Sequence, residues 1–221
     1  MARILCLETA TTNCSVTLSE NGSVIVLKED RSKGYSHAER LHVLISEALK
    51  EASWEMNDLE AVAISKGPGS YTGLRIGVSA AKGLCYALDI PLISVETLRL
   101  LAHQVPNNFG EKYTVPMIDA RRMEVYTGTF TESKELLNGY SALILQEDSY
   151  APFLNEGKVV FIGNGVGKFS EICQHPNAIF LKDRLPSSKE MAALSEAKYK
   201  IGDMEDVAYF EPYYLKDFIM G

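Results

Sequence analysis

Residues 67–77 read Gly-Pro-Gly-Ser-Tyr-Thr-Gly-Leu-Arg-Ile-Gly and form the most informative segment of the chain. An apolar run at 61–64 precedes this glycine segment, and a longer apolar segment from Val78 to Leu88 follows it. The order predicts a buried strand, a tight glycine turn and a helix. Because the first amides of a helix are unpaired and lie at the positive end of its dipole, phosphates bind at such turns.

The spacing of the glycine segment differs from that of the common nucleotide-binding loops. A P-loop has Gly, four residues and then Gly-Lys-Ser/Thr, whereas Leu74 stands here where that lysine belongs. The three-glycine pattern of dinucleotide-binding folds is absent as well. Two interpretations therefore stay open: a phosphate-binding turn, and a turn whose glycines only bend the chain, because glycine accepts positive φ.

The charge balance bears on the class of partner. The chain has 221 residues, 46% of them hydrophobic, so one large domain or two small lobes with a sizeable core is expected. Its formal net charge is -7. Proteins that hold RNA or DNA by themselves normally carry a basic field. Direct and tight nucleic-acid binding by this chain alone is therefore disfavoured, although a local basic patch is compatible with this balance.

Cysteine usage and hydropathy point to a compartment. The N-terminal apolar run is interrupted at Glu8, so we expect no signal peptide, and no apolar run approaches the length that spans a bilayer. We therefore expect a cytoplasmic protein that does not associate with a membrane. The cysteines form no C-x-x-C pair and match no zinc signature, so all four are expected as buried free thiols: Cys6, Cys14, Cys85 and Cys173.

The first half of the chain alternates strands and helices. Asn21-Gly22 between two short apolar runs predicts a hairpin, because both turn positions favour positive φ. Ser36 and Glu39 form a capping box at the start of a helix that extends to Ala52. The further expected elements are strand 61–65, helix 72–88, strand 91–95 and helix 96–105.

The second half repeats the same plan less clearly. The order of elements resembles the ribonuclease-H-like half of the actin, Hsp70 and sugar-kinase superfamily. We therefore expect an α/β fold of two ribonuclease-H-like (actin-like ATPase) lobes, each a mixed sheet with flanking helices, the second degenerate. The expected lobes are 1–105 and 106–221, and the C-terminal segment can pack back on the first lobe. The expected elements after the seam are strands at 114–119, 123–130, 142–147 and 159–163 and helices at 166–174 and 187–201.

Several motifs, spread nearly end to end, carry a family resemblance. The most specific are Lys66 to Gly77, the stretch Ser36-His37-Ala38-Glu39-Arg40-Leu41, and the stretch Ile118-Asp119-Ala120-Arg121-Arg122-Met123-Glu124-Val125-Tyr126. Weaker support comes from 4–11, from Phe161-Ile162-Gly163-Asn164-Gly165 and from Pro212-Tyr213-Tyr214-Leu215. With these motifs, the chain resembles the TsaB (YeaZ) family of tRNA threonylcarbamoyladenosine biosynthesis.

The resemblance implies a function and a set of partners. A related TsaD-type catalytic subunit transfers a threonylcarbamoyl group to the adenosine beside the anticodon of ANN-decoding tRNAs. Members like this chain are implied to be catalytically inactive paralogues that pair with that subunit and activate it. A TsaE-type ATPase joins them, and tRNA is reached indirectly through the complex. Without its partner, the chain is expected to form a homodimer.

The histidines of the chain do not match the metal site of the catalytic paralogue. That site uses two histidines one helical turn apart, whereas the corresponding stretch 95–103 holds His103 alone. His37 and His42 are five residues apart, so their side chains do not share a helix face. We therefore expect no metal and no catalytic residue.

The end of the first strand departs from the pattern of the kinases. Glu8-Thr9-Ala10-Thr11 lacks the glycine that kinases of this superfamily use, and Glu8 stands where many relatives have Asp. This favours a polar strand end capped by threonine hydroxyls. No cofactor is expected firmly, but a weak ATP or ADP site at or near the partner interface stays open, with the candidates Thr9, Thr11, Gly67, Gly69 and Ser70.

Helix 72–88 has a narrow polar stripe, and the rest of its surface is apolar or small. One face packs on the sheet, and the other needs cover as well, because a helix that is apolar nearly all round is normally buried. The helix before it has a similarly wide stripe. We expect a helical interface with another chain, although cover by the second lobe is an alternative. The interface candidates are Leu41, Leu44, Ile45, Ala48, Gly77, Ala80 and Leu84.

Two questions stay open at this point. The charged cluster of Asp119, Arg121, Arg122 and Glu124 suits a partner or an RNA phosphate, and it equally suits local ion pairing across a turn. The alternatives to a non-catalytic subunit are an ATP-dependent small-molecule kinase of the actin-like fold and a metallopeptidase-like enzyme.

Overall fold

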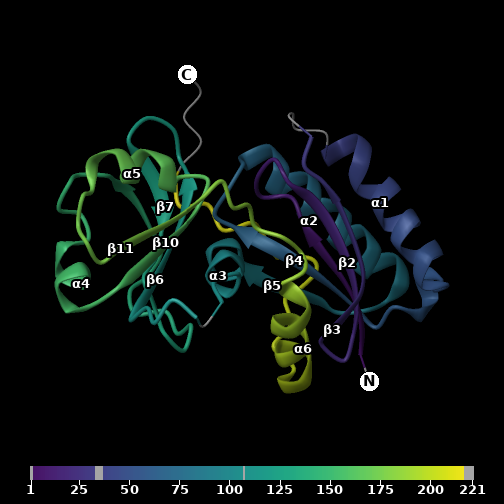
Figure 1. Cartoon of the computed structure of the whole chain (residues 1–221). Helices are drawn as coiled ribbons and strands as arrows, with labels where there is room; N and C mark the ends of the chain where they lie inside the picture. The colour runs from purple at the N-terminus through teal and green to yellow at the C-terminus, as the bar shows by residue number, and fades with distance from the viewer. Residues whose placement is uncertain (1, 33–36, 107, 217–221) are drawn as a thin grey trace. The chain divides into compact units, whose positions relative to one another are not determined.

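The computed structural model describes residues 2–32, 37–106 and 108–216 (Figure 1). The chain divides into two compact units: unit 1 comprises Met1–Leu100 and Pro186–Tyr213, and unit 2 comprises Leu101–Leu185 and Tyr214–Gly221. Each unit is built on its own mixed sheet, which confirms the expected fold class. The expected lobes were 1–105 and 106–221. In the structure the first division lies after Leu100. Residues 186–213 return to unit 1, where helix α6 (Met191–Ile201) packs, as the expected packing of the C-terminal segment on the first lobe allows.

Unit 1 contains a five-stranded sheet with the order β3-β2-β1-β4-β5. The first three strands are antiparallel, and β4 and β5 run parallel to β1. Asn21 (φ 53°) and Gly22 (φ 78°) form the turn between β2 and β3, which confirms the predicted hairpin. The strands are β1 (Arg3–Glu8), β2 (Cys14–Glu20), β3 (Ser23–Asp30), β4 (Ala61–Gly67) and β5 (Leu92–Glu96).

Helices cover both faces of this sheet (Figure 1). Side chains of β1 alternate between the faces, because successive residues of a strand point in opposite directions. Leu5 and Leu7 pack with α1 (His37–Ala52) and α2 (Tyr71–Leu88) in one apolar cluster. Ile4 and Cys6 pack in a second cluster that includes Met191 of α6 (Met191–Ile201). A short 3-10 helix, η1 (Met56–Asp58), precedes β4.

Unit 2 contains a sheet with the order β11-β10-β6-β7-β9, and β8 pairs with β6. Strands β6, β10 and β11 are parallel, whereas β7 and β9 are antiparallel additions. Its core contains a cluster of aromatic rings formed by Tyr150, Phe161 and Phe169. The elements are β6 (Tyr113–Asp119), β7 (Glu124–Thr127), β8 (Phe130–Thr131), β9 (Ser141–Ile144), α4 (Ala151–Glu156), β10 (Val159–Gly163), α5 (Val166–Ile172) and β11 (Ala178–Lys182).

Most predicted elements are present, with a few differences at their ends. Helix α3 (Thr97–His103) is shorter than the expected 96–105, and the expected strand 123–130 is divided into β7 and β8. Helix α6 starts at Met191 instead of 187, because the Ser187 hydroxyl binds Glu29 and the Ser188 amide binds Ser15. The expected cap Ser36 lies outside the described residues.

The cysteines and the hydropathy of the helices were also the subject of expectations. Cys6, Cys14, Cys85 and Cys173 are buried free thiols, as predicted. Within the described residues, no helix combines the length and the apolar character that crossing a bilayer requires.

Candidate functional site

The glycine segment leaves β4, turns, and enters α2 as the sequence predicts. Ser70 is the N-cap of α2, and its Oγ accepts a hydrogen bond from the Gly73 amide at 3.2 Å. The Ser70 amide donates to the carbonyl oxygen of Ala10 at 2.7 Å. Ala10 lies in the turn between β1 and β2, so the start of α2 is fastened to that turn.

The glycines of this segment face the chain's own backbone. A Cβ on Gly69 would lie 2.4 Å from the Ala10 oxygen, and a Cβ on Gly73 would lie 2.2 Å from the Thr9 oxygen. Gly67 has a φ of 116°, and a Cβ there would lie 2.5 Å from the Tyr213 oxygen. The absent side chains therefore make room for neighbouring segments of unit 1.

The two threonines of the β1–β2 turn are also engaged within unit 1. The buried Thr9 hydroxyl donates to the Gly73 oxygen at 2.8 Å. The Thr11 hydroxyl accepts weakly from the Asn13 amide at 3.4 Å, and the Thr11 oxygen accepts from His37 Nε2 at 2.7 Å.

The nucleotide candidates thus meet around one turn, where two of their donors already bind the chain's own backbone. The Ser70 amide and the Thr9 hydroxyl bind carbonyl oxygens, and the faces of Gly67 and Gly69 are filled by backbone. A phosphate needs converging free donors. These contacts favour a turn that joins segments, and the nucleotide assignment of Thr9, Thr11, Gly67, Gly69 and Ser70 stays a prediction.

Glu8, at the end of β1, is fully buried beside this turn. Its Oε1 accepts a hydrogen bond from the Ala10 amide at 2.6 Å. Burial raises the pKa of the Glu8 carboxyl to about 7, because desolvation penalises the charged form more than the nearby amides and the Ser65 hydroxyl favour it. Glu8 therefore holds the turn as a buried acid that titrates near neutrality.

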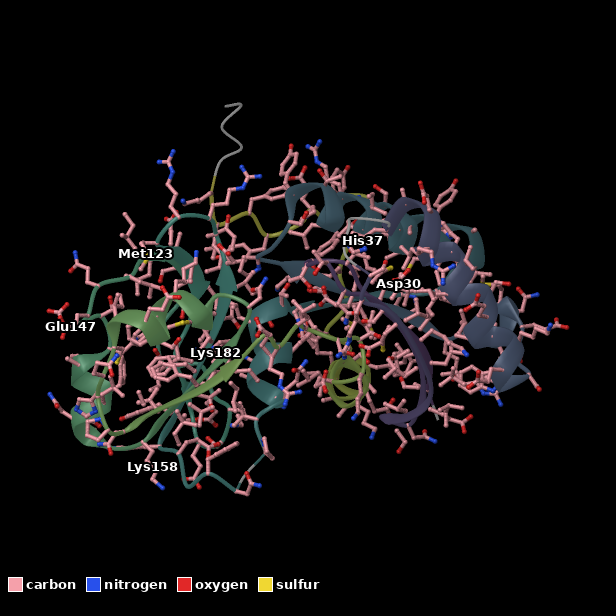
Figure 2. All side chains as sticks on the ribbon, turned by 45° about the horizontal axis from the view of Figure 1, so that its top comes forward. Asp30, His37, Met123, Glu147, Lys158 and Lys182 are labelled. Atoms are coloured by element: carbon pink, nitrogen blue, oxygen red, sulfur yellow. The ribbon has the colours of Figure 1, made fainter. Side chains whose placement is uncertain are left out.

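Three of the histidines stand on two helices, α1 and α3. His37 is buried at the start of α1, and desolvation lowers its pKa (Figure 2). His42 is exposed on α1, and His103 is exposed at the end of α3. Among residues 2–32, 37–106 and 108–216, no three His, Cys, Asp or Glu side chains are arranged to hold a metal ion.

Most of the expected interface residues are core residues of unit 1. Leu41, Leu44, Ile45 and Ala48 are at most 2% exposed and pack between α1 and the sheet. A Cβ on Gly77 would lie 2.2 Å from Thr9 Oγ1, so Gly77 faces the β1–β2 turn. The apolar stripe of α1 is thus covered by its own sheet, which corrects the expectation for these five residues. Ala80 and Leu84 remain partly exposed.

An open groove of about 630 Å³ lies between α1 and α2, and Ala80 and Leu84 are part of it. The small residues Ser79, Ala80 and Gly83 form half of the α2 side. A helix of another chain can approach closely at these positions, because little side chain separates the backbones. The remaining lining residues are Ala38, His42, Arg75 and Ile76.

A segment after α6 supports α2, and the sequence did not reveal it. Lys82 Nζ donates to the carbonyl oxygens of Ala208 at 3.1 Å and Phe210 at 3.0 Å. Val207 and Phe210 pack on the apolar cluster beneath α1 and α2. Lys82 stands in the polar stripe of α2, but the sequence gives no sign of a partner so distant along the chain.

The charged cluster lies at the turn between β6 and β7 in unit 2. Its two carboxylates bind lysines from elsewhere in the unit: Asp119 binds Lys168 at 2.7 Å, and Glu124 binds Lys216. Arg121 and Arg122 are exposed. The local ion pairing that the sequence left open therefore exists, but it joins the acids to lysines instead of to the arginines.

A family model matches most of the chain. Residues 32–218 match the family described as TsaD, tRNA N6-adenosine threonylcarbamoyltransferase. The transferase of that name from Staphylococcus haemolyticus is 37% identical over 130 residues, which cover 52% of this chain and 37% of the relative.

Two relatives match over nearly their whole length. The tRNA threonylcarbamoyladenosine biosynthesis protein TsaB of Escherichia coli is 28% identical, over 97% of this chain and 95% of the relative. The solved structure of YeaZ from Pseudomonas aeruginosa superposes with a TM-score of 0.85 at 28% identity, over 97% of this chain and 100% of that one.

Proposed function

The chain belongs to the TsaB (YeaZ) family of the actin-like superfamily, and on that premise we propose that it acts in tRNA threonylcarbamoyladenosine biosynthesis as a non-catalytic subunit. In this function it pairs with a TsaD-type catalytic subunit and activates it. The modified nucleoside is the adenosine beside the anticodon of ANN-decoding tRNAs. The work takes place in the cytoplasm, where a TsaE-type ATPase joins the pair.

The groove between α1 and α2 is the observation that carries this proposal. It is lined by Ala80, Gly83 and Leu84, which suits a helix of a second chain. A catalytic relative aligns with this chain over 130 residues at 37% identity, and we assign it a similar helix pair. Two similar helix pairs form a pseudo-symmetric bundle, and two copies of this chain form the corresponding homodimer when the catalytic subunit is missing.

The packing around the glycine segment supports a non-catalytic assignment. The Cβ positions of Gly67 and Gly69 lie against carbonyl oxygens, and the Ser70 amide, which could otherwise face a phosphate, donates to the Ala10 oxygen. Titration with Mg-ATP tests the kinase alternative directly. A working kinase binds ATP at micromolar concentrations and turns over a substrate, whereas we expect neither from the isolated chain.

Replacement of Ala80 by glutamate tests the groove. Ala80 is partly buried on the groove side of α2, whereas Ala87 is exposed near the end of the same helix, so Ala87→Glu is the matched control. We expect Ala80→Glu to abolish co-elution with the catalytic subunit, and Ala87→Glu to retain it. Both variants should keep the circular dichroism of the parent chain. Co-elution of the folded Ala80→Glu chain at the parent level contradicts the placement of the interface.

A tRNA modification assay tests activation separately from pairing. The catalytic subunit and the ATPase are assayed with the parent chain, with Ala80→Glu, and with no addition. Of the three reactions, we expect full modification of the tRNA only in the one that contains the parent chain. Equal modification in all three reactions contradicts the proposed function.

A further inference from the structure

The turn between β6 and β7 holds two adjacent arginines in an unfavourable backbone conformation. We name residues 119–124 the arginine turn. Arg121 has a φ of 71° and Arg122 a φ of 49°, which place both in the left-handed region. Side chains other than those of Asn and Asp rarely adopt this region, because Cβ crowds the following carbonyl oxygen. Asn or Gly would form this turn at a lower free energy, so its stability does not explain the arginines.

Three polar side chains brace the arginine turn. Asp119 Oδ1 accepts hydrogen bonds from the Arg121 amide at 2.6 Å and from Lys168 Nζ at 2.7 Å. Lys168 Nζ also donates to the carbonyl oxygens of Arg122 at 2.5 Å and Glu124 at 3.0 Å. Asn164 Oδ1 accepts from the Asp119 amide at 3.0 Å. The turn is therefore fixed before any ligand arrives.

Two sequence motifs of unit 2 converge on this one structure. Gly163 ends β10 and Asn164-Gly165 follows it, and a Cβ on Gly165 would lie 3.2 Å from the Asp119 nitrogen. The close approach of this loop brings Asn164 to the end of β6. Both motifs thus serve to hold the backbone that carries Arg121 and Arg122.

The bracing leaves the positive charge of the arginines uncompensated. Asp119 is bound by Lys168, and Glu124 is bound by Lys216. Within residues 2–32, 37–106 and 108–216, neither guanidinium has an ion pair or hydrogen bond. The turn thus presents two free cations in a chain whose net charge is -7.

We propose that the arginine turn binds phosphate groups of an RNA backbone. A guanidinium has a fork of donors that matches phosphate oxygens, and a fixed backbone loses little conformational entropy on binding. The proposal rests on the proposed function, which supplies a tRNA as the substrate of the complex, and it adds a direct contact between that RNA and this chain.

The surroundings of the turn favour RNA over an acidic segment of a protein. Stable protein interfaces have an apolar centre. Beside the arginine turn, the exposed apolar surface among the described residues comes from Met123 and from Ile144, which pairs with Glu124 across β7 and β9. Figure 2 shows Met123 at the outer surface of unit 2. This area is small for such a centre, whereas phosphate contacts need none.

The test removes both charges and relieves the backbone at once. In Arg121→Asn/Arg122→Gly, the new residues tolerate positive φ, so the variant should unfold at the same temperature as the parent or higher. The control for the change in net charge is Lys112→Gln/Lys158→Gln, in which Lys112 is paired with Glu156 in the parent chain. It also removes two exposed cations, but these precede β6 and β10 at the opposite ends of the same strands.

The affinity for unmodified tRNA is measured on the complex with the catalytic subunit, over a series of salt concentrations. We expect the arginine variant to bind at least about tenfold more weakly at low salt. The slope of log K against log salt should become shallower by about 2, one for each phosphate contact. The control should keep the affinity and the slope of the parent complex.

The outcomes separate this inference from the proposed function. If the arginine variant pairs normally and binds tRNA with the parent affinity and slope, the inference is overturned while the proposed function stands. If the variant loses the catalytic subunit or the ATPase instead, the turn contacts a protein, and the inference is again overturned. If the parent chain itself does not pair, the proposed function fails, and the same variant comparison on the isolated chain at low salt decides the inference.

Discussion

The hydroxyl of Thr9 donates a hydrogen bond to the carbonyl oxygen of Gly73 at 2.8 Å. This bond joins the turn after β1 to the first turn of α2, and the bond from the Ser70 amide to the Ala10 oxygen lies beside it. Segments more than sixty positions apart in the sequence are thereby fixed to each other. The position of α2, which forms one side of the groove between α1 and α2, depends on this attachment.

The packing of Gly73 predicts a loss of stability in Gly73→Ala. A Cβ would lie 2.2 Å from the Thr9 oxygen, which is backbone and cannot turn aside. We expect a loss of about 1–3 kcal/mol in the free energy of unfolding, measured by urea denaturation. Gly83→Ala is the control, because nothing lies within 4 Å of its Cβ position. That variant should gain about 0.5–1 kcal/mol from helix propensity. Equal stability of the two variants contradicts the packing.

The buried carboxyl of Glu8 predicts a pH dependence of stability. Its pKa is raised from 4.5 to about 7 by desolvation, so the folded state binds this proton more tightly than the unfolded state. Stability therefore falls as the pH rises from about 4.5 to 7, by about 3 kcal/mol at most. Glu8→Gln removes this pH-dependent contribution to the free energy of unfolding. The variant should therefore be at least as stable as the parent at pH 8.

Urea denaturation at several pH values between 5 and 8 measures this effect. The difference between the parent and Glu8→Gln cancels the contribution of His37, whose lowered pKa acts in the opposite direction. Glu47→Gln, at an exposed position of α1, is the control for replacing a glutamate by glutamine. Parallel curves for the parent and Glu8→Gln would show that Glu8 does not titrate in this range.

A buried ion pair in unit 2 predicts an asymmetric response to mutation. Lys134 Nζ lies 3.2 Å from Glu111 Oε1 and donates to Thr114 Oγ1 at 3.0 Å, and both charged side chains are nearly covered. Glu111→Gln leaves a buried unpaired ammonium, so we expect a loss of about 3–5 kcal/mol. The double variant Glu111→Gln/Lys134→Met should recover most of that loss in thermal unfolding. If the double variant is as unstable as the single one, the cost comes from packing and not from the unpaired charge.

The two sides of α1 predict different losses of stability when neighbouring side chains are truncated to alanine. Leu44 is 2% exposed and packs on the sheet, whereas Val43 is 41% exposed. Leu44→Ala should lose about 2–5 kcal/mol. Val43→Ala should stay within about 0.5 kcal/mol of the parent. Urea denaturation measures both free energies of unfolding. A larger loss in Val43→Ala than in Leu44→Ala would contradict the packing of the Leu44 side of α1 on the sheet.

Local signals predicted most of the fold. Asn21-Gly22 located the first hairpin, because few other residues tolerate both turn positions. The glycine segment located β4 and α2. The sequence did not predict which sheet α6 covers. Its contacts with β1 and β5 join residues that are far apart in the chain, and the apolar stripe of a helix does not say which surface it covers.

The candidate site was harder to predict for two physical reasons. The wide stripe of α1 is used by the chain's own sheet, so Leu41 and Leu44 are core residues, and the partner surface shrinks to the groove beside Ala80. Arg121-Arg122 carries no glycine or asparagine signal for positive φ. The left-handed turn exists because side chains from elsewhere in unit 2 fix it, and a linear pattern does not contain that information.

The return of α6 to the first sheet has a consequence for synthesis on the ribosome. Translation delivers β1 to β5 early, but Met191, which covers Ile4 and Cys6, emerges almost a hundred residues after the last strand of that sheet. One apolar face of the nascent sheet therefore stays without the cover of α6 while residues 101–185 of unit 2 are made. Ribosome pausing in that interval would expose the face to chaperones, and a chain that ends before residue 186 would never close it.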